Sequence, residues 1–469
     1  MIHNAASQGL LRLAMTAVCA LVVLGACATY QPLPLADETP LAGSLEELSI
    51  DASEFDSEFA GRYEIKPDDG LDLTEIGIVA VLNNPELKAQ RAAWQLAGAQ
   101  AFAAGLLPDP QLAVGLDRPT GDRTGLVNPW LFDLSYDIVP LITRQARIDA
   151  AQKGQEKVYL DLLWREWQVI QQARSMAVRL HFEEQQLALL HSMRSLYLDR
   201  YQRSTRALQD GNVTLDINGT DLTALVDILS QIKQLEQQNN QTRHSLNFLL
   251  GLAPQVAVTL SSMSPPDELD ASTIRSRLDA LPGVRPDLLA LQAGYASQEA
   301  NVRAAILSQF PSIGIGVNNA RDSGNIHSVG LSISLSLPLF NGNKGNIAIE
   351  RATRAQLREE YNARLASTEV DVDQLLSLQA ILLQQQNDLQ VYLPKLETLV
   401  ESARHAYAEG DIDALTFLNM ESTWVNKRLE QINLSQVLWE NRIAVEALLA
   451  LPGYPPQALL PAPVERDKT

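Results

Sequence analysis

The sequence is poor in the residue types that redox and metal chemistry require. Only two of its 469 residues are cysteines, Cys19 and Cys27, and its six histidines are scattered singly. Residues 1–26 have the layout of a secretory signal peptide, with Arg12 before an apolar run. Removal of this segment would leave Cys27 as the only thiol, which excludes a disulfide framework or a cysteine metal site, and we expect no metal or other cofactor.

Other chemical signatures are missing as well. Glycine-rich phosphate loops, nucleophile-elbow serines and His-Glu metal motifs do not occur, which argues against catalysis. The formal net charge of −19 argues against nucleic acid as a partner. Beyond residue 26 no run of 18 or more apolar residues occurs, so no helix of the mature chain is expected to span a bilayer. A membrane crossing would have to use strands.

The residues around Cys27 favour attachment to lipid. Cys27 follows Leu24-Gly25-Ala26, which resembles the lipobox of bacterial lipoproteins, where acyl chains on the new amino-terminal cysteine hold the protein to a bilayer. This resemblance makes Cys27 a predicted lipid anchor. The next residue is Ala28 and not the Asp that in lipoproteins tends to cause retention at the inner membrane, so the outer membrane is favoured. The alternative is an ordinary signal peptide with an incidental cysteine.

The rest of the chain is predicted to contain two related halves, offset by about 200 residues. Asn84-Pro85 and Arg285-Pro286 each open a helical stretch, and a glycine turn at Gly211 corresponds to one at Gly410. The predicted organisation is a signal peptide (1–26), an acylated tether (27–70), a first helix-strand-strand-helix-helix repeat (71–252), a proline-rich linker (253–284), a second repeat (285–452) and a tail (453–469).

Each half contains two short segments that alternate between apolar and small or polar residues, which is typical of strands with two different faces. They cover residues 111–117, 132–138, 312–318 and 328–337. A half-buried soluble sheet shows the same alternation. Segments of bilayer-crossing length with a polar face of Ser, Gly and Asp favour a membrane instead. Asp117, Asp133 and Asp137 would then line a wet lumen.

The longest helical patterns, 141–210 and 344–409, predict rods on the order of 100 Å at about 1.5 Å per residue. Apolar residues recur every seven positions in both, which indicates coiled-coil packing. Gly211 and Gly410 end the rods, and a second helix returns from each. Four strands cannot close a barrel, whereas three chains would supply twelve. We therefore expect a mixed α and β membrane protein: a trimeric 12-stranded transmembrane β-barrel, with four strands per chain, continued by a periplasmic α-helical coiled-coil barrel.

This arrangement resembles the TolC family of outer-membrane factors, the exit ducts of tripartite efflux pumps and type I secretion systems. The resemblance covers residues 70–452 and rests on the duplicated order of elements, the proline at each strand entry and the glycine hairpin at 407–415. It implies a homotrimer, a periplasmic adaptor (membrane fusion) protein that grips the tips at Gly211 and Gly410, and an inner-membrane pump such as an RND transporter.

The family pattern also suggests gate residues. Several members narrow the tunnel with a Leu and, four residues on, an Asp; Leu415 fits this pattern and Asn419 departs from it. Asp411 and Asp413 would form an anionic collar if they face the axis, although capping of the returning helix is the favoured role for Asp413, and the two roles are compatible. The expected function is a passive exit duct gated at its periplasmic tip. The alternative, a non-conducting coiled-coil lipoprotein of the envelope, explains the heptads but not the four strands.

Overall fold

The computed structural model describes residues 30–48, 70–261, 263 and 270–449. The chain divides into two units, Met1–Pro40 and Leu41–Thr469. In the first unit, the described residues 30–40 are exposed and form no helix or strand. The predicted signal peptide, the predicted anchor Cys27 and the predicted tail at 453–469 lie outside the described residues.

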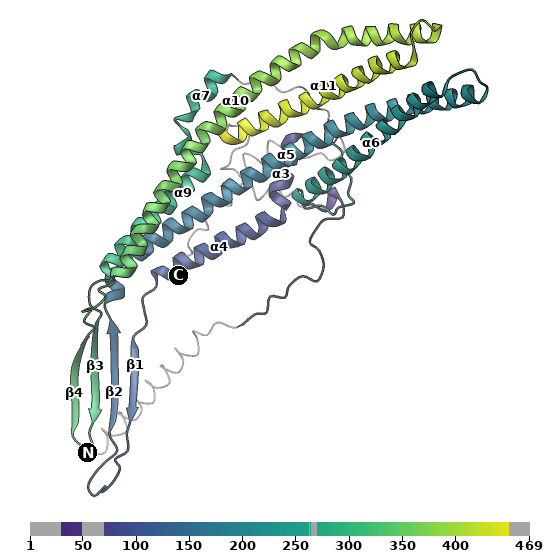
Figure 1. The fold of residues 1–469 in the computed structure, drawn as a ribbon. Coiled ribbons are helices and arrows are strands. Elements are labelled where there is room, and N and C mark those ends of the chain that lie inside the picture. Colours follow the sequence, from purple (N-terminus) through teal and green to yellow (C-terminus); the bar gives the residue numbers. More distant parts are fainter. Residues whose placement is uncertain (1–29, 49–69, 262, 264–269, 450–469) are drawn as a thin grey trace. The chain divides into compact units, whose positions relative to one another are not determined.

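The second unit contains the predicted long helices and four strands (Figure 1). From the amino terminus these are α3 (Leu73–Asn83), α4 (Pro85–Gly105), β1 (Gln111–Leu116), β2 (Trp130–Asp137), α5 (Val139–Gln209) and α6 (Leu215–Leu249). The same succession follows with α7 (Ala271–Leu278), α8 (Leu281–Val284), α9 (Pro286–Leu307), β3 (Ile313–Arg321), β4 (His327–Leu335), α10 (Lys344–Glu409) and α11 (Ala414–Leu449). The prediction of two long helices, each followed by a returning helix, is confirmed.

Helix α3 was not predicted, and a capping box explains why it forms. The Asp72 carboxylate accepts hydrogen bonds from the backbone N–H groups of Thr74 (2.6 Å) and Glu75 (2.8 Å), and Glu75 accepts one from the Asp72 N–H (2.9 Å). These bonds satisfy donors that would otherwise be left free at the helix start. The sequence signal, Asp followed three residues later by Glu before an apolar run, was present.

Parts of the predicted tether and linker are ordered. Ala42 forms a parallel bridge with Leu252, and the short 3-10 helix η1 (Leu45–Glu47) follows. Leu48 is buried in the core that α3, α5 and α6 share. Helices α7 and α8 lie inside the range expected to be a linker. The described residues 41–48 therefore pack against the helical body rather than forming an extended leash.

The four strands form one antiparallel sheet in the order β1-β2-β3-β4. Trp130 pairs with Arg321, which pairs with His327, and Asp133 pairs with Asn318. Because side chains alternate along a strand, this register collects the large apolar residues on one face. These are Leu112, Val114 and Leu116, then Phe132, Leu134 and Tyr136, then Ile313, Ile315 and Val317, and finally Val329, Leu331, Ile333 and Leu335. The opposite face carries mainly Ser, Gly, Asn and Asp.

The helices are amphipathic coiled-coil elements. Long-range packing joins α5 to α6, α9 and α11, and α10 to α9 and α11. Among the residues described, none of the helices is both long enough and apolar enough to span a membrane.

Candidate functional site: the hairpin tips

Two glycine turns form the tips of the helical hairpins. Gly211 (φ +73°) follows α5 and Gly410 (φ +84°) follows α10, and both adopt the left-handed conformation that glycine enters without steric cost. At each turn, the backbone N–H of the residue after the glycine donates a hydrogen bond to the carbonyl oxygen five residues earlier. The Asn212 N–H bonds to Ala207 O (2.7 Å), and the Asp411 N–H bonds to Ala406 O (2.8 Å). Because the glycines have open space around them, backbone conformation alone explains their presence.

Asp413 caps the returning helix α11. Its carboxylate accepts a hydrogen bond from the Thr416 backbone N–H (2.7 Å) and one from the Thr416 hydroxyl (2.8 Å). These bonds lower the pKa of the Asp413 carboxyl below its ordinary value. Asp411 lies two residues nearer the tip and is exposed. The capping role that the sequence offered as an alternative is therefore the one that the contacts support, and a role in gating stays a prediction.

Leu415 and Asn419 lie together at one groove. They line a cavity of about 580 Å³ between α6 and α11, near Tyr197 of α5. Leu415 is exposed for 58% of its surface. Asp216 and Asp227 of α6 line the opposite wall. The structure thus brings two of the predicted gate residues together and adds two carboxylates that the sequence reading did not name.

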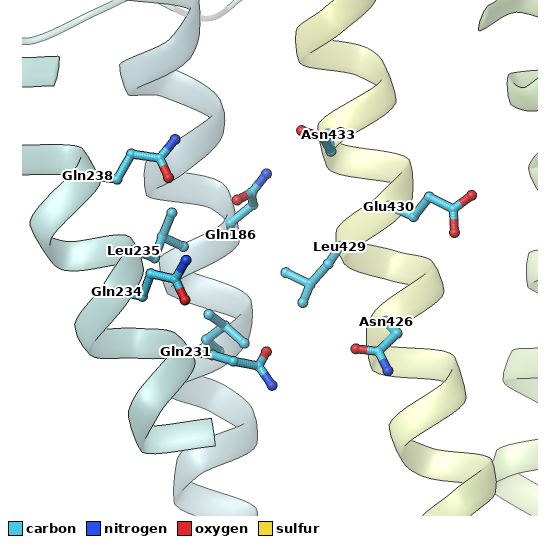
Figure 2. Close-up of a pocket in the computed structure, with 10 residues that line it drawn as sticks. Gln186, Gln231, Gln234, Leu235, Gln238, Asn426, Leu429, Glu430 and Asn433 are labelled. Carbon is cyan, nitrogen blue, oxygen red and sulfur yellow. The ribbon is translucent and has the colours of Figure 1, made fainter. Parts of the chain in front are cut away.

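A second groove continues along the same helices. Its volume is about 440 Å³, and Figure 2 shows Leu429 of α11 pointing toward α5 and α6. Amide side chains from all three helices dominate its lining: Gln186, Gln231, Gln234, Gln238, Asn426 and Asn433. Amides donate and accept hydrogen bonds without carrying charge, so the surface is polar, and Glu430 is the one charged residue among the described residues that line it.

Behind the grooves, a buried ionic cluster connects the helices of both hairpins. Arg200 of α5 bonds to Asp221 of α6 (2.7 Å) and to Glu421 of α11 (3.3 Å). Arg404 of α10 approaches Glu421 at 3.7 Å. The carboxylates are almost fully buried, at 1% and 0% side-chain exposure. A charged group in such a position must be paired, because desolvation strongly disfavours an isolated ion.

Aromatic rings complete the environment of Arg200. Its guanidinium lies 5.3 Å from the ring centroid of Phe417 and 5.9 Å from that of Tyr407, and these two rings stack on each other at 5.2 Å. Burial raises the pKa of the Glu421 carboxyl, while Arg200 and Arg404 lower it in opposition. Burial also raises the pKa of Tyr197, which lies beside Arg200, to about 12.

The sequence reading missed this cluster, although a signal exists. Phe417, Glu421 and Val425 occupy positions i, i+4 and i+8 of α11, and all three are buried. A carboxylate inside an apolar row predicts a buried partner of opposite charge. The sequence does not identify Arg200 as that partner, because Arg200 lies 221 residues away.

The predicted lumen acids share a face of the sheet. Asp133 and Asp137 of β2 point to the side that carries the Ser and Gly residues, and Asp117 follows β1 with the same alternation. The Asp137 carboxylate also accepts a hydrogen bond from the Val139 N–H at the start of α5 (3.0 Å). Within the parts of the chain that are described, no group of three or more His, Cys, Asp or Glu side chains is placed to hold a metal ion.

Comparison with known proteins agrees with this architecture. The family model for outer membrane efflux proteins matches residues 279–451. The probable outer membrane lipoprotein SilC of Salmonella typhimurium is 29% identical over 147 residues, which cover 29% of this chain and 32% of that protein. The cation efflux system protein CusC of Escherichia coli (strain K12) is 25% identical over 240 residues, covering 48% and 50%. The matches thus span a third to a half of these relatives' lengths.

The fold comparison extends over nearly the whole chain. The Campylobacter jejuni CmeC outer membrane channel has a TM-score of 0.68 and 16% sequence identity, covering 90% of this chain and 94% of that one. A four-stranded antiparallel sheet joined to long helical hairpins is the fold of outer membrane channels of this type. Residues 279–451 match the family of outer membrane efflux proteins, and the chain has the TolC-like fold of solved outer membrane channels.

Proposed function

We propose that the chain is the outer-membrane exit duct of a tripartite efflux pump or type I secretion system. It works as a homotrimer and as a passive path, with energy supplied by an inner-membrane pump such as an RND transporter. A periplasmic adaptor protein docks at the tips marked by Gly211 and Gly410. Acyl chains on Cys27 provide an additional attachment to the outer membrane.

The observation that carries the proposal is the two-faced sheet. On its apolar face Val329, Leu331 and Ile333 are 77%, 83% and 70% exposed. Burying a side chain of this size contributes roughly 1.5 to 3 kcal/mol, so a row of them in water is strongly unfavourable. The other face is small and polar, as the lining of a water-filled path requires. A sheet with lipid against its apolar face and water against its polar face places both faces in a favourable environment.

The free edges of the sheet support a trimer. β1 and β4 each pair with one neighbouring strand, which leaves an unpaired row of backbone groups on either side. In hydrocarbon each unsatisfied group costs several kcal/mol. Pairing β4 of one copy with β1 of the next removes both edges. Three copies give a closed sheet of twelve strands, which is wide enough for a pore, whereas two copies give one that side chains fill.

The amide-lined grooves support a duct that accepts varied cargo. Uncharged hydrogen-bonding side chains form most of the lining along α6 and α11, beside the carboxylates Asp216, Asp227 and Glu430, and selectivity would rest with the inner-membrane pump. The exposed Leu415 beside Asn419 is the proposed narrow point. Asp413 is a poor probe of this gate because its loss would also remove the cap of α11.

The test is single-channel conductance in a planar bilayer, with the mass in detergent taken from the same sample. We expect trimers that insert and conduct weakly, and a higher conductance for Leu415→Ser. Leu399→Ser is the matched control, because Leu399 is also half exposed but lies on α10 and lines neither groove. A monomer that never conducts would instead indicate a structural lipoprotein. Equal changes in conductance for the two substitutions would contradict a role of Leu415 in the gate.

A further inference from the structure

The charged residues of the sheet are segregated by face. Among the strand residues, the acids Asp133 and Asp137 lie on the polar face. The basic residues Arg321 and His327 lie on the apolar face and are paired directly with each other across β3 and β4. Both are at the end of the sheet where the β1-β2 and β3-β4 loops connect the strands. The other end of the apolar face, around Tyr136, Ile313 and Leu335, carries no charged side chain.

Arg321 is held in place at this rim. Its Nη2 donates a hydrogen bond to the Asn128 carbonyl (2.8 Å), in the loop before β2. The two loops are also joined by the Val127 N–H, which bonds to Ser323 O (3.0 Å). The Nε of Arg321 is buried and makes no hydrogen bond with any residue that the structure describes. The guanidinium is therefore fixed by one bond, and because the buried Nε does not reach an external group, the N–H donors on the Nη atoms are the ones left for a further acceptor.

Aromatic groups flank the cation. Trp130 on β2 and His327 on β4 lie on either side of Arg321 in the register, and their rings approach to 6.0 Å between centroids. The rings of Trp130 and Phe132 contact edge to face at 5.3 Å. Tryptophan with a neighbouring cation, above a band of aliphatic side chains, is the composition that suits a lipid headgroup boundary.

Asp322, the acid next to Arg321 in the sequence, does not neutralise this site. The Asp322 carboxylate accepts a hydrogen bond from the Ile326 N–H (2.9 Å) and closes the turn between β3 and β4. Neither Asp322 nor the exposed Asp122, which bonds to Thr124, forms an ion pair with Arg321. Of the residues that the structure describes, none forms a salt bridge with it.

We propose that Arg321, with Trp130 and His327, binds the anionic phosphate of a lipid headgroup in the leaflet on the loop side of the sheet. The site rests on the proposed membrane role of the apolar face. A guanidinium is suited to a phosphate because its N–H donors match the phosphate oxygens in geometry as well as charge. One site per subunit would fix the depth of the sheet, since the aliphatic band begins directly below it.

The test is lipid retention by the full-length protein in detergent, measured by native mass spectrometry. The probes are lipid A, whose phosphates are anionic, and phosphatidylcholine, whose phosphate is balanced by choline. We expect lipid A to be retained preferentially and Arg321→Gln to weaken it about fivefold per subunit, as for one cation near an anionic surface. Arg321→Lys, which keeps the charge but not the guanidinium geometry, should weaken the binding less than Arg321→Gln does. Arg194→Gln is the control, because Arg194 is exposed on α5.

Equal retention of lipid A by wild type and Arg321→Gln, or an equal loss with Arg194→Gln, would overturn the proposal. Displacement of lipid A by inorganic phosphate, but not by chloride at the same ionic strength, would also overturn it, because the site would then prefer the free ion. If Arg321→Gln does not assemble, lipid A retention by the wild-type protein is measured at increasing salt concentration. Binding through the charged headgroup must weaken as salt is raised, whereas purely apolar binding does not. Conductance distinguishes the failure of this proposal from the failure of the proposed function. If the protein conducts but its lipid retention does not depend on Arg321, only the lipid-site proposal is wrong.

Discussion

Arg200→Met should loosen the connection between the two hairpins near their tips. The substitution keeps a long apolar stem but leaves Asp221 and Glu421 buried without their shared cation. Removing one partner of a buried ion pair costs about 3 to 5 kcal/mol, because the remaining charge stays desolvated. Arg404 still approaches Glu421, at 3.7 Å, so we expect a loss at the lower end of that range.

The loss should depend on pH. The folded-state pKa of Glu421 is raised above its ordinary value of 4.5, so the stability that its protonated form provides is present below that value and is lost as pH rises through the folded-state pKa. Arg200 opposes this shift. Without Arg200 the pKa of Glu421 rises further, so the stability that protonated Glu421 provides is lost at a pH closer to neutral. Arg200→Met should therefore differ from wild type less at about pH 5 than at about pH 8.

Hydrogen exchange of backbone amides around Asp221 and Glu421 measures this local opening. Arg194→Met is the matched control on the same helix and should change the opening free energy by less than about 0.5 kcal/mol. Adding Glu421→Gln to Arg200→Met removes one orphaned charge and should recover part of the loss. A change in exchange for Arg200→Met no larger than that of the control, or easier opening with the second substitution, would contradict a stabilising role for the Arg200 cluster.

Three further outcomes can be checked. Gly251→Ala should destabilise by more than about 1 kcal/mol, because φ is +72° and the added Cβ would lie 2.6 Å from Asn83 O, whereas Gly219→Ala, in open space on α6, should be neutral or stabilising by thermal melting. Asp133→Asn should reduce a modest cation preference in a planar bilayer; unchanged selectivity would place Asp133 outside the lumen. Cys27→Ala should lose acylation by mass yet fractionate with the outer membrane, and periplasmic recovery would contradict the strand argument.

Local sequence patterns were sufficient to predict most of the helices and strands. The long helix α10 begins and ends where the heptads and Gly410 predict, because coiled-coil spacing and glycine turns are encoded within a few residues. The four strands followed from strict alternation in the same way. Helix α3 was missed although its capping box is local. The packing of Leu48 could not be predicted, since the Pro- and acid-rich stretch around it gives no periodic signal.

The functional groupings depend on contacts that no local pattern specifies. Arg321 meets Trp130 only because β2 and β3 pair in one register, and these strands come from different halves of the chain. A slip of one residue would turn Arg321 to the polar face and place Asp133 among aliphatic side chains. The apolar residues of both halves therefore fix the register, and the register fixes where the charges fall. The face on which the acids lie and the position of the rim cations both follow from this pairing, so a substitution that shifts β3 should disturb both ion preference and lipid binding.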